Sequence, residues 1–335
     1  MDITAKELAK LLNVSPAAVS IALNDKPGVS PETRERIKNA AAFYGYTGKN
    51  FKPDGLKRQR RLSLVIFKKQ GGQIVEDTPF FSSLTEGIAA ACQKNGFMLD
   101  IRYLYEKPEL SVEISEIVSM RPEGIILLAT EMHSEDFESM RSLPIPMVIL
   151  DTYFENIAKD YVVINNVQGA FLATNYMVQK YQSQPGYLRS SYAITNFDER
   201  ADGFYKAVRK NDLSPSASIV HSLTPTIDGA YVDMKRILEE DRPLASCYFA
   251  DNDIIAMGAL HAFRDHGYRI PEDVAIIGFD NTSLAELVDP PLTTINVPKQ
   301  AMGKLAVERL IAIIDHDEPP IKIELLTNLV IRESL

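Results

Sequence analysis

The chain has 335 residues, which is more than one ordinary domain and enough for a small module and a large core. It contains no apolar run near the roughly 20 residues that span a bilayer, and its N-terminus is polar, so we expect no membrane partner, no signal peptide and a cytoplasmic location. Cys92 and Cys247 lie far apart in apolar patterns, and the five histidines form no ligand-spaced cluster, so we expect a reduced protein without a metal or cofactor.

Charge is distributed unevenly along the chain. The net charge is −9, but residues 1–61 hold 12 Lys and Arg against 6 Asp and Glu, a net of +6. The remaining residues hold 24 against 39, a net of −15. A basic N-terminal segment on an acidic body predicts that any nucleic acid is bound by that segment.

Three short helices are predicted in the basic segment. The first begins with a Thr-x-x-Glu capping box, and the other two begin with Ser-Pro, which places a serine at the N-cap and proline at the first helical position. These signals lie at Thr4 to Glu7, Ser15-Pro16 and Ser30-Pro31, and the helices end near Asn13, Leu23 and Gly45. The short turn between the first two helices is typical of a helix-turn-helix, although small interaction modules share the pattern.

From Leu62 onward, short apolar strands alternate with amphipathic helices, which predicts a parallel, doubly wound α/β sheet. The alternation restarts after Asp151, so we expect two lobes with ligands bound at the carboxyl ends of the strands. The predicted strands are 62–67, 98–104, 124–129, 146–151, 162–164, 187–188, 219–220, 247–250, 274–279, 293–297 and 322–332. The predicted helices are 80–95, 110–120, 134–142, 167–181, 199–211, 227–239, 252–266 and 299–314.

Sequence motifs over almost the whole chain have the order and spacing of one known family. In the N-terminal segment they are Val14-Ser15, Val19-Ser20, Leu23-Asn24, Val29-Ser30, Thr33-Arg34 and Gly45-Tyr46. In the body they are 249–259 (FADNDIIAMGA), 270–281 (IPEDVAIIGFDN), 291–295 (PLTTI) and 329–334 (LVIRES). These residues resemble the lac repressor family (LacI/GalR-type regulators).

The resemblance implies a domain organisation. Residues 1–47 would form a helix-turn-helix DNA-binding domain, residues 48–61 a hinge or linker, and residues 62–335 an effector-binding and dimerisation domain like a periplasmic binding protein. Lobe 1 would comprise about 62–160 and 293–320, and lobe 2 about 161–292 and 321–335. The C-terminal strands would cross between the lobes, so that the lobes move as hinged units.

The resemblance also implies where DNA is contacted. The second helix would meet base edges, and Leu56 in the hinge would be the apolar wedge for the minor groove, although Pro53 and Gly55 oppose a helix there. Ile21 cannot form the bidentate guanine contact of the family's usual arginine, so we predict contact with thymine methyl groups and readout of DNA shape. The DNA-contacting residues are predicted to be Thr4, Ser15, Pro16, Ala17, Ala18, Ser20, Ile21, Asn24, Ser30, Tyr46, Leu56, Lys57 and Arg58.

Seven residues of the body are implied as effector contacts: Phe80, Phe81, Asp151, Arg200, Phe249, Asn252 and Asp280. The guanidinium of Arg200 can hold two ligand oxygens, and the carboxylate of Asp280 can accept from adjacent hydroxyls. Most of these residues have an ordinary structural alternative. Arg200 would be a solvated arginine at a helix start, Asp280 a turn residue, Asn252 an N-cap, and Phe80 and Phe81 core residues.

Binding fits this chain better than catalysis, because glycine-rich phosphate loops, a nucleophile elbow and a Cys/His arrangement are absent from the sequence. We hypothesise a homodimeric transcription regulator, a repressor of carbohydrate-utilisation genes. It would bind a double-stranded DNA operator and a small polar effector, a sugar, between the lobes. The alternatives are a solute-binding protein of a transport system, a regulator that responds to a purine or another non-sugar ligand, and a sugar-modifying enzyme.

Overall fold

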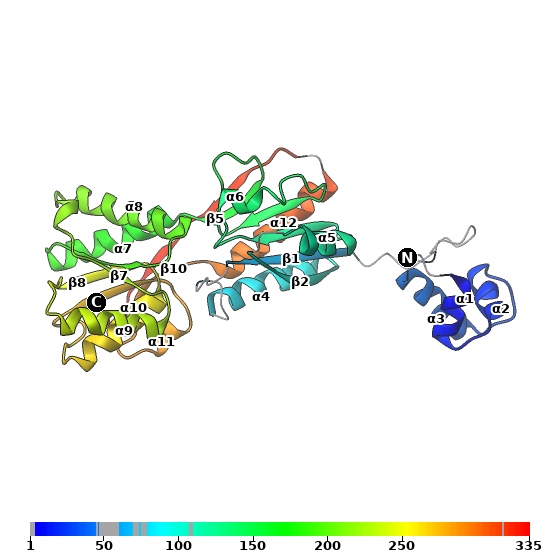
Figure 1. Ribbon diagram of the computed structural model, residues 1–335, viewed down its shortest axis with the longest axis horizontal. Helices are drawn as coiled ribbons and strands as arrows, with labels where there is room; N and C mark the ends of the chain where they lie inside the picture. The colour runs from blue at the N-terminus through cyan, green and yellow to red at the C-terminus, as the bar shows by residue number, and fades with distance from the viewer. Residues whose placement is uncertain are drawn as a thin grey trace. The chain divides into compact units, whose positions relative to one another are not determined.

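The computed structural model describes residues 4–44, 46, 60–69, 74, 79–106, 110–316 and 318–335. The chain forms two compact units (Figure 1): residues 1–60 with 96–98, and residues 61–95 with 99–335. The first unit contains the predicted headpiece, and the second contains both predicted lobes. The hinge residues Leu56, Lys57 and Arg58 lie outside the described residues, so the predicted minor-groove wedge stays a prediction.

The headpiece consists of three helices, α1 (Ala5–Leu12), α2 (Pro16–Leu23) and α3 (Pro31–Phe43), which matches the predicted order and starts. The capping box is present: the Thr4 hydroxyl accepts from the backbone N–H of Glu7 at 3.3 Å, and the Glu7 carboxylate accepts from the Thr4 N–H at 2.8 Å. The Ser15 hydroxyl accepts from the Ala18 N–H at 3.1 Å and so caps α2. The small apolar core is formed by Leu8, Ala9, Val19, Ala22, Leu23, Ile37 and Ala41.

Lobe 1 is built on a six-stranded sheet of order β11-β5-β4-β3-β1-β2. Its strands are β1 (Arg60–Lys68), β2 (Phe97–Tyr105), β3 (Gly124–Leu128), β4 (Met147–Leu150), β5 (Asp160–Ile164) and β11 (Lys322–Leu325). Its helices are α4 (Pro79–Lys94), α5 (Ser111–Ser119), α6 (Ser134–Phe137) and α12 (Lys299–Asp315). Gly87 and Gly303 let α4 and α12 approach closely, because a Cβ at either glycine would collide with the backbone of the other helix.

Lobe 2 is built on a second six-stranded sheet of order β12-β10-β9-β8-β6-β7. Its strands are β6 (Gly186–Ser190), β7 (Val220–Leu223), β8 (Cys247–Ala250), β9 (Ala275–Asp280), β10 (Thr293–Asn296) and β12 (Asn328–Val330). Its helices are α7 (Asn166–Tyr181), α8 (Thr195–Lys210), η1 (Pro215–Ala217), α9 (Ile227–Glu239), α10 (Asp253–Asp265) and α11 (Leu284–Leu287). Figure 1 shows α7 and α8 on one face of this sheet and α9 and α10 on the other.

The strand pairing corrects the expected lobe boundaries. β5 and β11 pair with each other in the first sheet, whereas β10 pairs with β9 in the second. Residues 160–164 and 322–325 therefore belong to lobe 1, and residues 293–296 to lobe 2. The predicted terminal strand 322–332 is two strands in different sheets, because the chain crosses between the lobes at Thr327. Apolar periodicity identifies a strand but does not identify its partner, which explains these errors.

Two helices also differ from their predicted bounds. The predicted helix 134–142 is regular only over Ser134–Phe137, and α8 begins at Thr195 rather than at residue 199. The early start matters because it adds a turn to the helix that carries Arg200. In the described part of the chain, no helix combines the length and apolar character needed to cross a membrane.

Candidate effector site and DNA-binding surface

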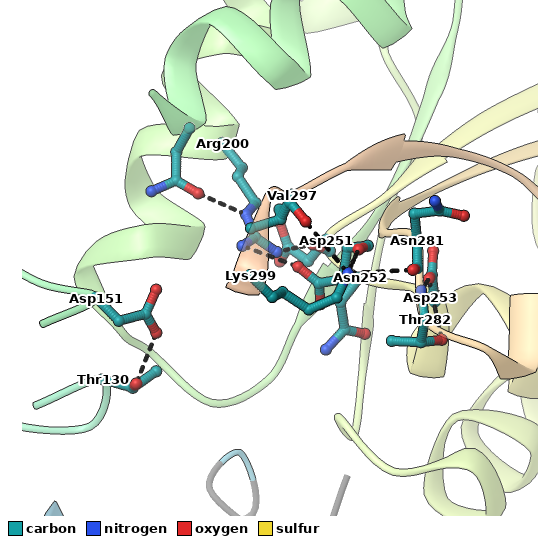
Figure 2. Close-up of polar contacts among 12 residues, drawn as sticks. Thr130, Asp151, Arg200, Asp251, Asn252, Asp253, Asn281, Thr282, Val297 and Lys299 are labelled. Carbon is teal, nitrogen blue, oxygen red and sulfur yellow. Dashed lines mark hydrogen bonds and ion pairs between the residues drawn. The ribbon is translucent and has the colours of Figure 1, made fainter. Parts of the chain in front are cut away.

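The candidate effector site is formed where several strands end. Asp280 closes β9, Asp251 and Asn252 follow β8, and Asp151 follows β4 of lobe 1. Arg200 reaches the same region from the second turn of α8. Figure 2 shows Arg200, Asp251 and Lys299 close together, with Asp151 and Thr130 to one side. The fold thus brings together residues that are distant in the sequence, such as Asp151 and Asp280, which are 129 positions apart.

Arg200 is a buried residue with fixed contacts, only 4% exposed. Its Nε donates to Asn166 Oδ1 at 2.9 Å, its Nη1 to the Asp251 carbonyl at 2.5 Å, and its Nη2 to Asp280 Oδ1 at 3.4 Å. The guanidinium also lies 3.8 Å from the centroid of the Phe279 ring. The solvated alternative is therefore wrong. Three of the five guanidinium N–H groups are engaged in these bonds, which leaves two that a ligand can use.

Asp280 is held in an unusual backbone conformation, with φ of 108°. Its carbonyl accepts from Lys299 Nζ at 2.6 Å, and the same ammonium donates to the carbonyls of Asn281 at 3.1 Å and Val297 at 3.3 Å. Burial raises the pKa of the Asp280 carboxyl, while the charges of Arg200 and Lys299 lower it. The side chain is thus held beside two cations at the edge of the sheet.

Two buried aspartates fix the backbone around the site through hydrogen bonds. The Asp251 carboxylate accepts from the Tyr187 hydroxyl and from the Ser190 N–H at 2.7 Å, and burial raises its pKa to about 6. The Asp253 carboxylate accepts from the Thr282 N–H at 2.8 Å and from the Thr294 hydroxyl, and burial raises its pKa to about 7. Asp253 thereby fixes the turn that follows Asp280.

Asp151 is the lobe 1 member of the candidate site. Its backbone has φ of 70°, its Oδ2 accepts from the Thr130 hydroxyl at 2.6 Å, and the residue is 3% exposed. Burial raises its pKa to about 6, although the positive charge of Arg200 opposes that effect. The carboxylate therefore lies within electrostatic range of the arginine of lobe 2.

The remaining predicted contacts fall into three environments. Phe249 is fully buried against Tyr187, Phe204 and Phe279, so the structure places it in the core and not in the site. Asn252 Oδ1 accepts from the Ile255 N–H at 2.9 Å, which is the N-cap alternative, and its Nδ2 has no partner among the described residues. Phe80 is buried and Phe81 partly exposed, with ring centroids 5.0 Å apart.

Sequence reasoning missed five residues that shape this site: Asn166, Asp251, Asp253, Lys299 and Thr130. Asp251 and Asp253 lie in the stretch that carries the family resemblance, and an aspartate on each side of Asn252 after a strand was a signal for a buried acidic cluster. Asn166 and Lys299 gave no signal beyond helix starts, because their roles depend on segments distant in the sequence.

Most of the predicted DNA contacts in the described part of the headpiece are exposed, on α2 and at the helix ends. Seven are exposed: Thr4, Ser15, Pro16, Ala17, Ser20, Asn24 and Ser30. Ala18 and Ile21 are partly buried, and Tyr46 packs against the headpiece core, so its ring has a structural role. Ile21 does not belong to that core cluster, and an added Cβ at Gly28 would lie 3.4 Å from its side chain.

Comparisons with known proteins agree with this architecture. Residues 4–48 match the family model described as bacterial regulatory proteins, lacI family, and residues 177–335 match that of the periplasmic binding protein-like domain. The chain is 28% identical to the HTH-type transcriptional repressor PurR of Mannheimia succiniciproducens, over 99% of this chain and 98% of that protein. It is 29% identical to the PurR repressor of Vibrio atlanticus, over 94% of each.

Solved structures share the whole fold. The lac repressor bound to ONPG in the repressed state has a TM-score of 0.74 at 20% identity, with 100% of each chain covered. The transcriptional regulator CelR in complex with cellobiose has a TM-score of 0.72 at 24% identity, with 99% of each covered. A regulator from Enterococcus faecium with bound ribose has a TM-score of 0.70 at 23% identity, covering 81% of this chain and 98% of that one.

These matches confirm the predicted fold class, a helix-turn-helix domain followed by a two-lobed α/β body with mainly parallel sheets. The curated relatives are transcriptional repressors, and the N-terminal match lies on the three-helix headpiece. The chain thus combines a DNA-binding domain of the lacI family of bacterial regulatory proteins with a periplasmic binding protein-like domain, and this is the domain organisation of DNA-binding transcription regulators rather than of enzymes.

Proposed function

We propose that this protein represses carbohydrate-utilisation genes and that a sugar bound at Arg200, Asp280 and Asp151 controls its binding to an operator. The observation that carries the proposal is the buried Arg200, whose guanidinium retains two donors beside the Asp280 carboxylate. A fixed cation beside carboxylates suits adjacent hydroxyls, which donate to the carboxylate and accept from the guanidinium.

A purine is the second candidate effector, and the relatives favour it. The curated proteins quoted above carry the name PurR, whereas two of the structural neighbours hold cellobiose or ribose. The site gives the sugar more support, since its described polar groups include carboxylates, a guanidinium and an amide, which can exchange hydrogen bonds with sugar hydroxyls. Phe80 and Phe81, the two predicted aromatic contacts of lobe 1, already pack edge to face against each other.

A thermal-shift titration tests the effector class directly. Purified protein is heated with D-ribose, cellobiose, hypoxanthine or guanine, because a ligand that binds only the folded state raises the melting temperature. We expect a shift with a sugar that disappears in Arg200→Lys and persists in Arg189→Lys, a matched change at an exposed arginine of β6. A shift with a purine alone would replace the sugar proposal with the purine one.

We also propose that the protein acts as a homodimer, in which two headpieces bind the two half-sites of a two-fold operator. Support comes from apolar side chains that lobe 1 exposes on its edge strand β2 and on α5. These are Met98, Ile101, Tyr103 and Tyr105 on β2, and Val112 and Val118 on α5, each between 37% and 62% exposed. Large apolar side chains exposed together on an edge strand are typical of an interaction site.

The rival reading as a transport solute-binding protein predicts a sugar site but no DNA binding. An electrophoretic mobility assay with DNA enriched from a random pool separates the two readings. Sugar binding without retention of any enriched sequence would favour the transport reading. The match of residues 4–48 to a regulator headpiece supports the repressor.

A further inference from the structure

Lys299 is the first residue of α12, the helix of lobe 1 that follows the chain's crossing at Val297 and Pro298. Its ammonium donates to three backbone carbonyls: that of Asp280 at 2.6 Å, that of Asn281 at 3.1 Å and that of Val297 at 3.3 Å (Figure 2). An ammonium has three N–H groups, so each of them has an acceptor here. Its donors are therefore committed to the backbone, and the residue acts on the turn after β9 rather than on a ligand.

The two carbonyls of lobe 2 belong to consecutive residues in the left-handed region of the backbone. Asp280 has φ of 108° and Asn281 has φ of 50°. Residues other than glycine seldom adopt positive φ, so this turn needs bonds that hold it in place. One ammonium that binds both carbonyls supplies such bonds, and it fixes the direction in which the Asp280 side chain leaves β9.

The side chain of Asn281 holds the same turn to the strands that cross between the lobes. Its Oδ1 accepts from Arg332 Nη2 at 2.8 Å, and its Nδ2 donates to Asn296 Oδ1 at 3.0 Å. Asn296, the last residue of β10, donates in turn from its Nδ2 to Asn328 Oδ1 at 3.1 Å, at the start of β12. One of these strands precedes a crossing and the other follows one. The turn is thus bonded to both crossing strands as well as to α12.

On the side of lobe 1, the position of Lys299 is set by the packing of α12 on α4. A Cβ at Gly87 of α4 would collide with the backbone of Gln300, so the two helices touch at the residue next to Lys299. The ammonium also lies 5.9 Å from the centroid of the Phe80 ring, which α4 carries. The backbone of Lys299 is therefore fixed by lobe 1, whereas the carbonyls of the β9 turn that it binds belong to lobe 2.

We propose that Lys299 is a positioning residue that holds the Asp280 turn of lobe 2 against the start of α12 in lobe 1. Its importance for regulation rests on the proposed function, in which Asp280 contacts the effector. A fixed turn presents the carboxylate to ligand hydroxyls in one orientation. A ligand that shifts this carboxylate also shifts the ammonium and the start of α12, so the lobes respond to the ligand at the crossing.

Hydrogen exchange followed by mass spectrometry on the full-length, effector-free protein tests this positioning role. The reporter is the segment 279–283, in which two amides have side-chain acceptors. The Asn281 N–H donates to Thr294 Oγ1 at 3.3 Å. The Thr282 N–H donates to Asp253 Oδ2 at 2.8 Å. Both bonds depend on the conformation of the turn, so their exchange reports whether the turn is held.

Lys299→Met keeps the apolar stem of the side chain and removes its three donors. We expect exchange in 279–283 to become faster by about tenfold, the effect of losing a hydrogen bond to a charged group. Exchange in β6, elsewhere in the same sheet, should not change. Lys299→Arg keeps the charge and N–H donors that reach the carbonyls, so it should retain near-normal protection of the turn.

Lys304→Met is the matched control, because Lys304 is an exposed lysine of the same helix and pairs with Glu308 at 3.7 Å. Normal protection of 279–283 in Lys299→Met would overturn the proposal. So would equal acceleration in Lys304→Met, in Lys299→Arg or in β6, since each would mean an effect other than loss of the donors. If Lys299→Met does not fold, Lys299→Gln decides by the same criterion. The experiment contains no effector, so failure of the sugar proposal would leave its result intact.

Discussion

At the residue scale, Arg200 shows how burial turns a common surface side chain into a component of a site. Its neighbours Asn166 and Asp251 occupy one donor each, and the pairing with Asp280 is long at 3.4 Å. The Arg200–Asp280 ion pair is long, and two guanidinium N–H groups take no part in the three bonds above. A ligand can therefore bind to the guanidinium without breaking a strong hydrogen bond. The ring of Phe279 lies 3.8 Å from the guanidinium and packs against it.

The first prediction concerns this guanidinium. Arg200→Lys keeps the positive charge but removes the planar fork that satisfies Asn166 and a ligand together. We expect sugar affinity, measured by calorimetry, to fall by at least about tenfold, the equivalent of one charged hydrogen bond. Operator affinity without effector should stay unchanged. Loss of operator binding in Arg200→Lys, with a normal melting temperature, would contradict the proposal that Arg200 acts only in effector binding.

The second prediction concerns the pH dependence of stability at Asp253. Burial raises its pKa from 3.8 to about 7, so the folded state binds the proton more tightly than the unfolded chain. The resulting stabilisation is complete below pH 3.8 and is lost as the pH rises through about 7. Asp253→Asn cannot titrate, so the free energy of unfolding of wild type relative to this variant should increase as the pH falls from about 7 to 5, by at most about 1.4 kcal/mol per unit.

Urea titrations at several pH values measure this difference. Asp273→Asn is the control, because its pairing with Arg269 lowers the pKa of Asp273 to about 2, below the tested range. Asp280 lies beside Asp253 and raises its pKa, so Asp280→Asn should weaken the dependence. A stability difference between wild type and Asp253→Asn that does not change with pH would mean that Asp253 stays ionised throughout.

At the scale of secondary-structure elements, the sequence predicted features that depend on local signals better than features that depend on long-range strand pairing. The capping box at Thr4 and the Ser15-Pro16 start gave the helix bounds of the headpiece, because caps act within three residues. The prediction of one strand over 322–332 was wrong because its two halves pair with strands far apart in the chain. Apolar periodicity carries no information on that pairing. Arg200 and Asp280 were identified through motifs, whereas Asn166 and Lys299 acquire their roles only through the tertiary fold.

The third prediction belongs to helix α2. Ile21 is partly exposed and lies outside the headpiece core, so Ile21→Ala should cost little stability. If its side chain contacts a thymine methyl group, truncation should relax the base preference at one position of each half-site in a selection experiment. Leu11→Ala, at an exposed position of α1, is the control and should leave that preference unchanged. An unaltered base preference in Ile21→Ala would mean that Ile21 does not contact the bases.

At the scale of the whole molecule, the two sheets and the crossings between them make the body suited to hinged motion. Thr327 lies at one crossing, where its hydroxyl donates to Gln168 Oε1 at 2.7 Å and its carbonyl accepts from Gln168 Nε2 at 3.1 Å. A crossing fixed by specific bonds allows the lobes to rotate while the connecting strands stay in register. We propose that an effector acts on the paired headpieces of the dimer through this motion.

The fourth prediction concerns assembly. Val112 on α5 is 62% exposed and is one of the apolar side chains of the proposed dimer surface. Placing a charge in a buried interface is costly, so Val112→Glu should convert the proposed dimer to a monomer in sedimentation velocity, with operator affinity reduced. Val220→Glu, at an exposed position of β7 in lobe 2, should remain dimeric. A dimeric Val112→Glu protein would place the interface elsewhere.

The most direct test of the central claim is a fluorescence anisotropy titration of a selected operator with the full-length protein, in the presence and absence of the sugar that raises its melting temperature. We predict that the sugar changes the operator affinity by about fivefold or more in wild type, the usual range of allosteric coupling, and leaves it unchanged in Arg200→Lys. An operator affinity that responds to hypoxanthine or guanine but to no sugar, or that Arg200→Lys leaves fully responsive, would contradict the account.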